Sequence, residues 1–259
     1  MRHRLKSVSL TLALVGSSTI ALFVPILNPH WQVFAQTQTV SPTAVSIQQL
    51  LATAKQHYRR AEFKSAIAFY QQALTQAQQT GDRANQIEAL LQLGHIDFWI
   101  ENVPQAEVKI QQALKLSRES KDRTREGFSL ALLSVVYRNR QEYAKANESL
   151  KEALTIAQQT NNQKLEARSR LLLGTVFLFQ KQYPQALETL QQALKVAQAD
   201  NNQDEMAHIY DWMAATYREL KDFKQTEALS QQQQTLSQSI GYRLAEYDGL
   251  STIVALRQQ

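Results

Sequence analysis

The sequence repeats itself every forty residues. When residues 47–240 are aligned with themselves at that shift, similar side chains coincide without any insertion. One set of equivalent positions is large and apolar: Phe63, Val103, Tyr143, Tyr183 and Phe223. Two other sets are alanine in the first four copies: Ala66, Ala106, Ala146 and Ala186, and Ala73, Ala113, Ala153 and Ala193. A period of this length indicates an array of equal units, each of which buries its apolar face against its neighbours.

Within one copy, the apolar residues fall at helical spacing, as in Leu90, Leu93 and Ile96. A further set of equivalent positions is small: Ala54, Gly94, Ser134, Gly174 and Ala214. Small side chains allow two antiparallel helices to approach closely. Gly81, Asn161 and Asn201 fall where one copy ends, and these residue types adopt the left-handed conformation at the least steric cost. Each copy is therefore predicted to be a helix, a tight turn and a second helix.

The predicted first helices span 47–60, 84–101, 124–140, 164–180 and 204–220, and the second helices span 63–79, 103–119, 143–159, 183–199 and 223–239. Alanine, leucine and glutamine dominate the composition, and all three tolerate helix interiors. No segment combines β-branched residues, alternation and flanking turns, so no strand is expected.

The order of residues within a copy resembles the tetratricopeptide repeat. The resemblance is clearest in Leu173-Gly174…Phe177…Tyr183…Ala186…Leu190…Ala193, and it covers residues 47–240. The usual repeat has 34 residues, and the forty-residue version is similar to the repeats of kinesin light chains. The resemblance implies an all-α, right-handed α-solenoid of five helix-turn-helix repeats plus a C-terminal capping helix over residues 241–259.

The fifth copy departs from the pattern, because Thr226, Ser230 and Gln233 stand where the others have Ala, a large apolar residue and Ala. A terminal repeat lacks one neighbour, so we expect these polar residues on its open side.

The first thirty-five residues have the parts of a secretory signal. Three basic residues lie within Met1–Lys6, residues 8–27 are uncharged and mostly apolar, and Val33-Phe34-Ala35 suits a cleavage site before Gln36. The alternative is an uncleaved anchor, since twenty uncharged residues are long enough to cross a bilayer. Residues 36–46 are expected to be a flexible lead-in. Both alternatives predict an extracytoplasmic location, either periplasmic or secreted, or anchored to the membrane and facing outwards.

Several classes of function find no support in the sequence. The chain has no cysteine, which excludes disulfides and thiolate metal sites. Its formal charge of +5 includes three cations of the leader, and 5 − 3 = +2 gives no reason to expect a nucleic-acid partner. No catalytic motif or metal-ligand cluster is recognisable, so we expect no enzymatic activity and no cofactor. Asp97 stands at a packing position, and Arg138 is its expected ion-pair partner.

In solenoids of this family the first helix of each repeat lines a concave groove. Carried over to this sequence, the groove positions combine aromatic and cationic side chains: Lys55, Tyr58, Arg59, His95, Phe98, Trp99, Arg138, Asn139, Arg168, Phe179, His208, Asp211 and Arg218. Such a surface suits an extended peptide or a helix with acidic and apolar side chains. Alternatively, Phe98, Trp99 and Phe179 fill the seams between helices.

The leading hypothesis is therefore an extracytoplasmic protein–protein interaction scaffold that binds a partner segment in its groove. The alternative is a membrane-anchored structural organiser of an envelope complex, with the leader as its transmembrane helix.

Overall fold

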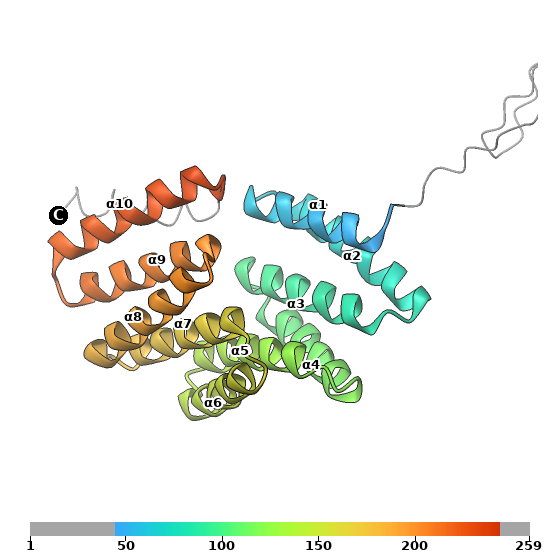
Figure 1. Cartoon of the computed structure of the whole chain (residues 1–259), viewed down its shortest axis with the longest axis horizontal. Helices are drawn as coiled ribbons and strands as arrows, with labels where there is room; N and C mark the ends of the chain where they lie inside the picture. Colours follow the sequence, from blue (N-terminus) through green and yellow to red (C-terminus); the bar gives the residue numbers. More distant parts are fainter. Residues whose placement is uncertain (1–44, 244–259) are drawn as a thin grey trace, which may run out of the picture. The chain divides into compact units, whose positions relative to one another are not determined.

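The computed structural model describes residues 45–243, which form ten α-helices and no strand (Figure 1). Consecutive helices form pairs joined by short turns, and each pair packs on the next. The helices are α1 (Ile47–Arg59), α2 (Phe63–Thr80), α3 (Arg83–Trp99), α4 (Val103–Glu119), α5 (Arg123–Asn139), α6 (Tyr143–Gln159), α7 (Gln163–Phe179), α8 (Tyr183–Ala199), α9 (Gln203–Glu219) and α10 (Phe223–Ser239).

The predicted all-α array of helix pairs is confirmed, and the helices begin and end within two residues of the expected positions. The predicted leader, residues 1–35, lies outside the described residues. So do nearly all of the lead-in, 36–46, and of the capping helix, 241–259. Between residues 45 and 243, no helix combines the length and the apolarity that crossing a membrane requires.

Every turn contains one residue with a positive φ angle, at intervals of twenty residues. Gly81, Asn161 and Asn201 adopt this conformation between repeats, as predicted. The turns inside the repeats adopt it too, at Ala61, Glu101, Gln141, Lys181 and Lys221, although none of these is glycine. The backbone bonds explain the geometry: Asn162 N–H donates to Ala157 C=O at 2.9 Å and Asn161 N–H to Gln158 C=O at 3.3 Å. This pattern closes the end of a helix through a left-handed residue.

The first helix of repeats two to five begins at an acidic or amide side chain. Asp82, Asp122, Asn162 and Asn202 each accept a hydrogen bond from the backbone N–H three residues later. These caps satisfy an N–H group that has no partner within the helix. The chain therefore starts each repeat at a fixed point, which keeps the forty-residue register.

The small residues lie where two helices of a pair touch. A Cβ atom on Gly174 would be 2.7 Å from Cγ of Leu190 and 3.3 Å from the carbonyl oxygen of Ala186. Ala66, Ala106, Ala146 and Ala186 are fully buried. The close approach of paired helices that the sequence predicts is confirmed.

The expectation for the fifth repeat was wrong. Thr226, Ser230 and Gln233 are buried, and so is Ser237. Thr226 and Ser230 are equivalent to Ala186 and Leu190, which contact the paired helix in repeat four. The polar residues therefore lie where the two helices of the pair contact each other.

The expected partner of Asp97 was also wrong. The buried Asp97 carboxylate pairs with Lys109, which lies on the second helix of the same repeat. Arg138 instead donates a hydrogen bond to Thr175 Oγ1 at 2.5 Å. Lys109 lies twelve residues after Asp97, and the helix–turn–helix of the repeat brings the two side chains together.

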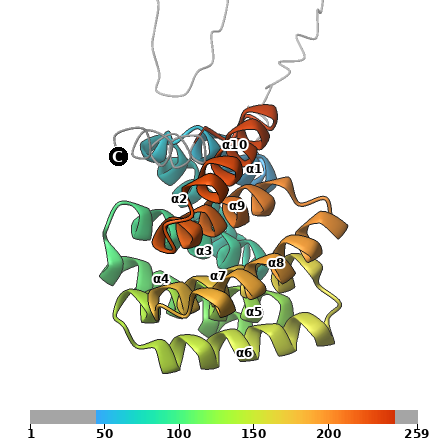
Figure 2. The same ribbon diagram turned by 90° about the vertical axis from the view of Figure 1, so that its left-hand side faces the viewer.

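The first helices of the repeats form the inner layer of this unit. α3 contacts α5, α5 contacts α7 and α7 contacts α9. Figure 2 shows α10 and α6 at opposite ends, with the inner helices between them. The array curves so far that α1 of the first repeat lies beside α9 and α10 of the last (Figure 1).

Candidate functional site

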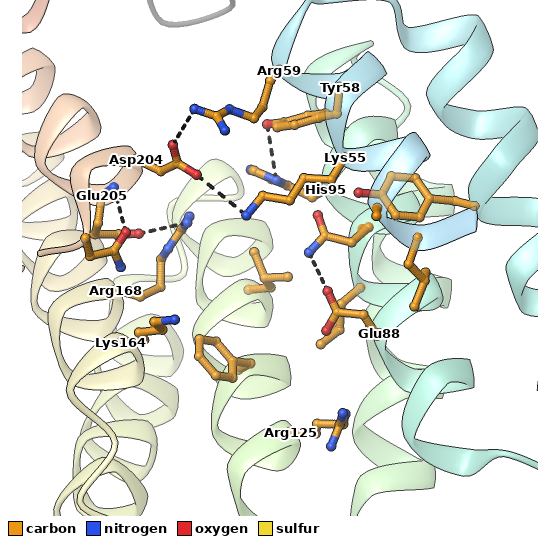
Figure 3. Close-up of a pocket in the computed structure, with 18 of the residues that line it drawn as sticks. Lys55, Tyr58, Arg59, Glu88, His95, Arg125, Lys164, Arg168, Asp204 and Glu205 are labelled. Atoms are coloured by element: carbon orange, nitrogen blue, oxygen red, sulfur yellow. Dashed lines mark hydrogen bonds and ion pairs between the residues drawn. The ribbon is translucent and has the colours of Figure 1, made fainter. Parts of the chain in front are cut away.

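Side chains join the first repeat to the last. The Arg59 guanidinium donates to the carbonyl oxygen of Ile240 at 2.7 Å and lies 3.1 Å from the Asp204 carboxylate. Lys55 Nζ lies 3.6 Å from the same carboxylate, and Arg59 also packs over the ring of Tyr242. The first repeat is thus joined to the last by ion pairs, a hydrogen bond and a ring contact. Figure 3 shows the ion pairs of Arg59 and Lys55 with Asp204.

The inner surface of the array lines a solvent-accessible cavity of about 600 Å³. Its walls come from the inner helices of all five repeats, with Tyr70 from α2 and Tyr242 from the segment after α10. Pockets that hold small ligands usually measure about 300–1,000 Å³. The cavity is therefore large enough for a small molecule or a few residues of a peptide.

Six of the thirteen predicted groove residues line this cavity: Lys55, Tyr58, Arg59, His95, Arg168 and His208. The other seven do not, and they are Phe98, Trp99, Arg138, Asn139, Phe179, Asp211 and Arg218. Trp99 is 37 % exposed and Phe179 is 49 % exposed, so neither is a buried filler of a seam.

The sequence prediction missed the rest of the lining: Gln48, Leu51, Ala52, Tyr70, Asn85, Glu88, Leu91, Gln92, Arg125, Phe128, Leu132, Lys164, Asn202, Asp204, Glu205 and Tyr242. A signal for part of this set was present. One forty-residue set of equivalent positions lines the cavity in every repeat: Gln48, Glu88, Phe128, Arg168 and His208. The groove prediction contains only Arg168 and His208 of this set, because its members are chemically unlike one another.

Basic groups outnumber acidic groups around the cavity. Five cations, Lys55, Arg59, Arg125, Lys164 and Arg168, face three carboxylates, Glu88, Asp204 and Glu205, which leaves 5 − 3 = +2. Alongside the charges lies an apolar surface that includes Leu91, Phe128 and Leu132. The combination suits a ligand that carries both an anionic and an apolar group.

The deepest charges of the cavity form a pair. The Glu205 side chain is 4 % exposed, and its Oε2 lies 2.9 Å from the Arg168 guanidinium. Burial raises the pKa of Glu205, and the nearby Arg168 opposes that rise. Glu205 Oε1 is buried without a hydrogen-bond partner among the described residues. The pair fixes α7 and α9 beside the cavity.

Two histidines and two tyrosines form a polar belt at the cavity wall. Trp99 Nε1–H donates to His95 Nε2 at 3.3 Å, and His95 Nδ1 lies 3.4 Å from the Tyr58 hydroxyl. His208 Nε2 lies 2.9 Å from the Tyr242 hydroxyl, and the two tyrosine side chains are hydrogen-bonded to each other. The belt therefore runs from the second repeat through the first to the last.

Both histidines of the belt are neutral. Burial, reinforced by the charge of Arg168, lowers the pKa of His95 and of His208 to about 3. The hydrogen bonds agree, because an indole N–H only donates and His95 Nε2 must therefore carry a lone pair. Neutral rings do not act here as cations toward a ligand.

No group of three or more His, Cys, Asp or Glu side chains within residues 45–243 is placed to hold a metal ion. The cavity chemistry among those residues is that of ion pairs, hydrogen bonds and aromatic surface, which are the means of noncovalent binding.

Two protein-family models match parts of the chain. A tetratricopeptide-repeat family model matches residues 128–199, and a model for anaphase-promoting complex subunit 5 matches residues 50–140. No curated protein matches the sequence. Residues 128–199 therefore match a tetratricopeptide-type repeat, and they lie within an array of five helix pairs.

Two solved structures illustrate the shared fold. BtubC (BKLC) from P. vanneervenii is 18 % identical at a TM-score of 0.53, over 75 % of this chain and 81 % of that one. A Rap protein complexed with competence and sporulation factor is 15 % identical at 0.66, over 82 % of this chain and 57 % of that one. At these identities the similarity shows a shared fold and nothing more specific.

Proposed function

We propose that this protein is an extracytoplasmic, noncatalytic scaffold that binds a segment of a partner protein. The observation that carries the proposal is the cavity of about 600 Å³ that all five repeats line. An inner surface shared by every repeat is the part of a solenoid best placed to hold another chain.

The chemistry of the lining favours a peptide segment over a purely apolar molecule. Charged and amide side chains surround the apolar surface of Leu91, Phe128 and Leu132. Peptide backbone has hydrogen-bonding groups at every residue, and such groups need polar partners when they leave water. The charge of +2 at the cavity favours a segment that contains acidic residues. No cofactor is required for binding of this kind.

One of the similar structures supports the proposal by analogy. The Rap protein with this fold was solved in a complex with competence and sporulation factor. Fold similarity alone does not define a function, so the support for this chain comes from its own cavity.

The proposal is tested by filling the cavity. Ala52 is an exposed residue that lines it, and Ala68 is an exposed residue of α2 that does not. We expect Ala52→Trp to reduce capture of partner proteins from an envelope extract at least ten-fold, because the indole takes up space that the segment needs. Ala68→Trp, with the same substitution outside the cavity, is expected to capture as the unchanged protein does. Equal capture by the two variants would exclude the cavity as the binding site.

The extracytoplasmic part of the proposal rests on residues 1–35, which have the composition of an export signal. N-terminal sequencing of the protein purified from its own cells tests it. A chain that begins at Gln36 in the soluble envelope fraction is the expected result. A chain that retains Met1 in the membrane fraction would favour the anchored organiser, and one that retains Met1 in the cytoplasm would contradict export.

A further inference from the structure

A second group of aromatic and cationic side chains lies outside the cavity, on the inner helices α5, α7 and α9. Arg138 of α5 lies 4.8 Å from the ring centroid of Phe179 on α7 and 5.4 Å from that of Trp212 on α9. The two rings also contact each other, with centroids 6.2 Å apart. We call these three residues, together with Thr175, the Arg138 cluster.

Arg138 is a buried cation without a carboxylate. The residue is 7 % exposed, and it forms no ion pair with any residue between 45 and 243. One of its five N–H groups donates to Thr175 Oγ1, and that hydroxyl donates in turn to the carbonyl oxygen of Leu172. Burial lowers the pKa of Arg138 to about 10, with only the Tyr143 phenol acting against it. Buried charges are normally paired, so this guanidinium is unusual.

The position of the cluster also points to a ligand. Phe179 leaves half of its surface in solvent beside the guanidinium. Arg138 lies six residues beyond Leu132 of the cavity wall, about 9 Å along α5 at 1.5 Å per residue. A segment that occupies the cavity needs about three extended residues to reach the cluster.

We propose that the Arg138 cluster is a binding subsite for a carboxylate that is adjacent to an aromatic or large apolar side chain. The guanidinium supplies planar N–H donors that match a carboxylate, and Phe179 and Trp212 supply the ring surface for the neighbouring side chain. Thr175 holds the guanidinium in place. The subsite deepens the proposed function, because the carboxylate would belong to the bound partner segment, either on an acidic side chain or at its C-terminus.

Small peptides test the subsite directly. Acetyl-Glu-Phe-amide and acetyl-Gln-Phe-amide differ only in the carboxylate, and acetyl-Ala-Phe with a free C-terminus presents the carboxylate at the chain end. Trp212 becomes the only tryptophan when Trp31→Phe and Trp99→Phe are combined in the full chain. Its fluorescence then reports occupancy. We expect at least one carboxylate peptide to bind at least ten-fold more tightly than acetyl-Gln-Phe-amide, and the tighter of the two identifies the source of the carboxylate.

Three further variants complete the test. Arg138→Gln is expected to abolish the ten-fold preference, and Thr175→Val, which keeps the cation, is expected to weaken it. Arg140→Gln is the matched control, because Arg140 is an exposed residue of the turn after α5 that pairs with Glu107. Equal affinity for the carboxylate and amide peptides in the unchanged cluster would overturn the subsite. So would an undiminished preference in folded Arg138→Gln and Thr175→Val. Loss of partner capture in Ala52→Trp alongside normal capture in Arg138→Gln would refute the subsite and leave the scaffold function intact.

Discussion

Replacing Ala146 by tryptophan is expected to lower the free energy of unfolding by about 3 kcal/mol. Ala146 is fully buried within a cluster that contains Leu130, Val136 and Leu150. An indole at this position needs space that only movement of α5 away from α6 provides. Because each repeat is stabilised mainly by its neighbours, damage to the third repeat leaves only two repeats on each side. Arrays of fewer than three repeats are rarely stable.

The measurement is urea unfolding followed by far-UV circular dichroism. Ala144→Trp is the matched control, since Ala144 is an exposed residue on the same helix and receives the same indole. We expect the control to unfold in one transition near the midpoint of the unchanged protein. Ala146→Trp is expected to unfold at lower urea or in two transitions. Coincident curves for the two variants would contradict the packing described for the third repeat.

The helix pairs were predictable because their determinants are close in sequence. Gly174 meets Leu190 sixteen residues later, and the same kind of contact recurs in other repeats. Because the same local preferences recur in five copies, the sequence predicted the helix bounds to within two residues. The polarity of Thr226 and Ser230 predicted exposed side chains, but both are buried, because their positions face the paired helix.

Closure of the array was not predictable from the same evidence. Arg59 meets Ile240 across 181 residues, and this contact depends on a rotation that accumulates over five repeats. A small difference in the rotation per repeat is multiplied along the array. The sequence therefore predicted a concave groove with cationic and aromatic residues, but not the contacts that join the first repeat to the last. Asp204 and Tyr242 were missed for this reason, because their role arises only where the last repeat reaches the first.

The neutral histidines of the cavity wall predict a loss of stability in mild acid. The pKa of His95 and of His208 is about 3 in the folded protein and about 6.5 in the unfolded chain. Below pH 6.5 the unfolded chain takes up protons that the folded rings do not, so the unfolded state is favoured as the pH falls. Each ring lowers the free energy of unfolding by up to about 1.4 kcal/mol per pH unit between pH 6.5 and pH 3.

At pH 4.5 the two rings together are expected to destabilise the fold by up to roughly 5 kcal/mol relative to pH 7.5. Glu205 acts in the opposite direction, because burial raises its pKa and the folded state then gains protons as the pH falls. The difference between two proteins removes that contribution. The free energy of unfolding of the unchanged chain and of the His95→Gln, His208→Gln double variant is measured at both pH values. We expect the double variant to lose several kcal/mol less on acidification, with each single variant between the two. Parallel losses in the unchanged chain and the double variant would mean that the two rings are hydrated and titrate normally. In that case the belt from Trp99 to Tyr242 does not exclude water, and the cavity is more open than its side-chain contacts indicate.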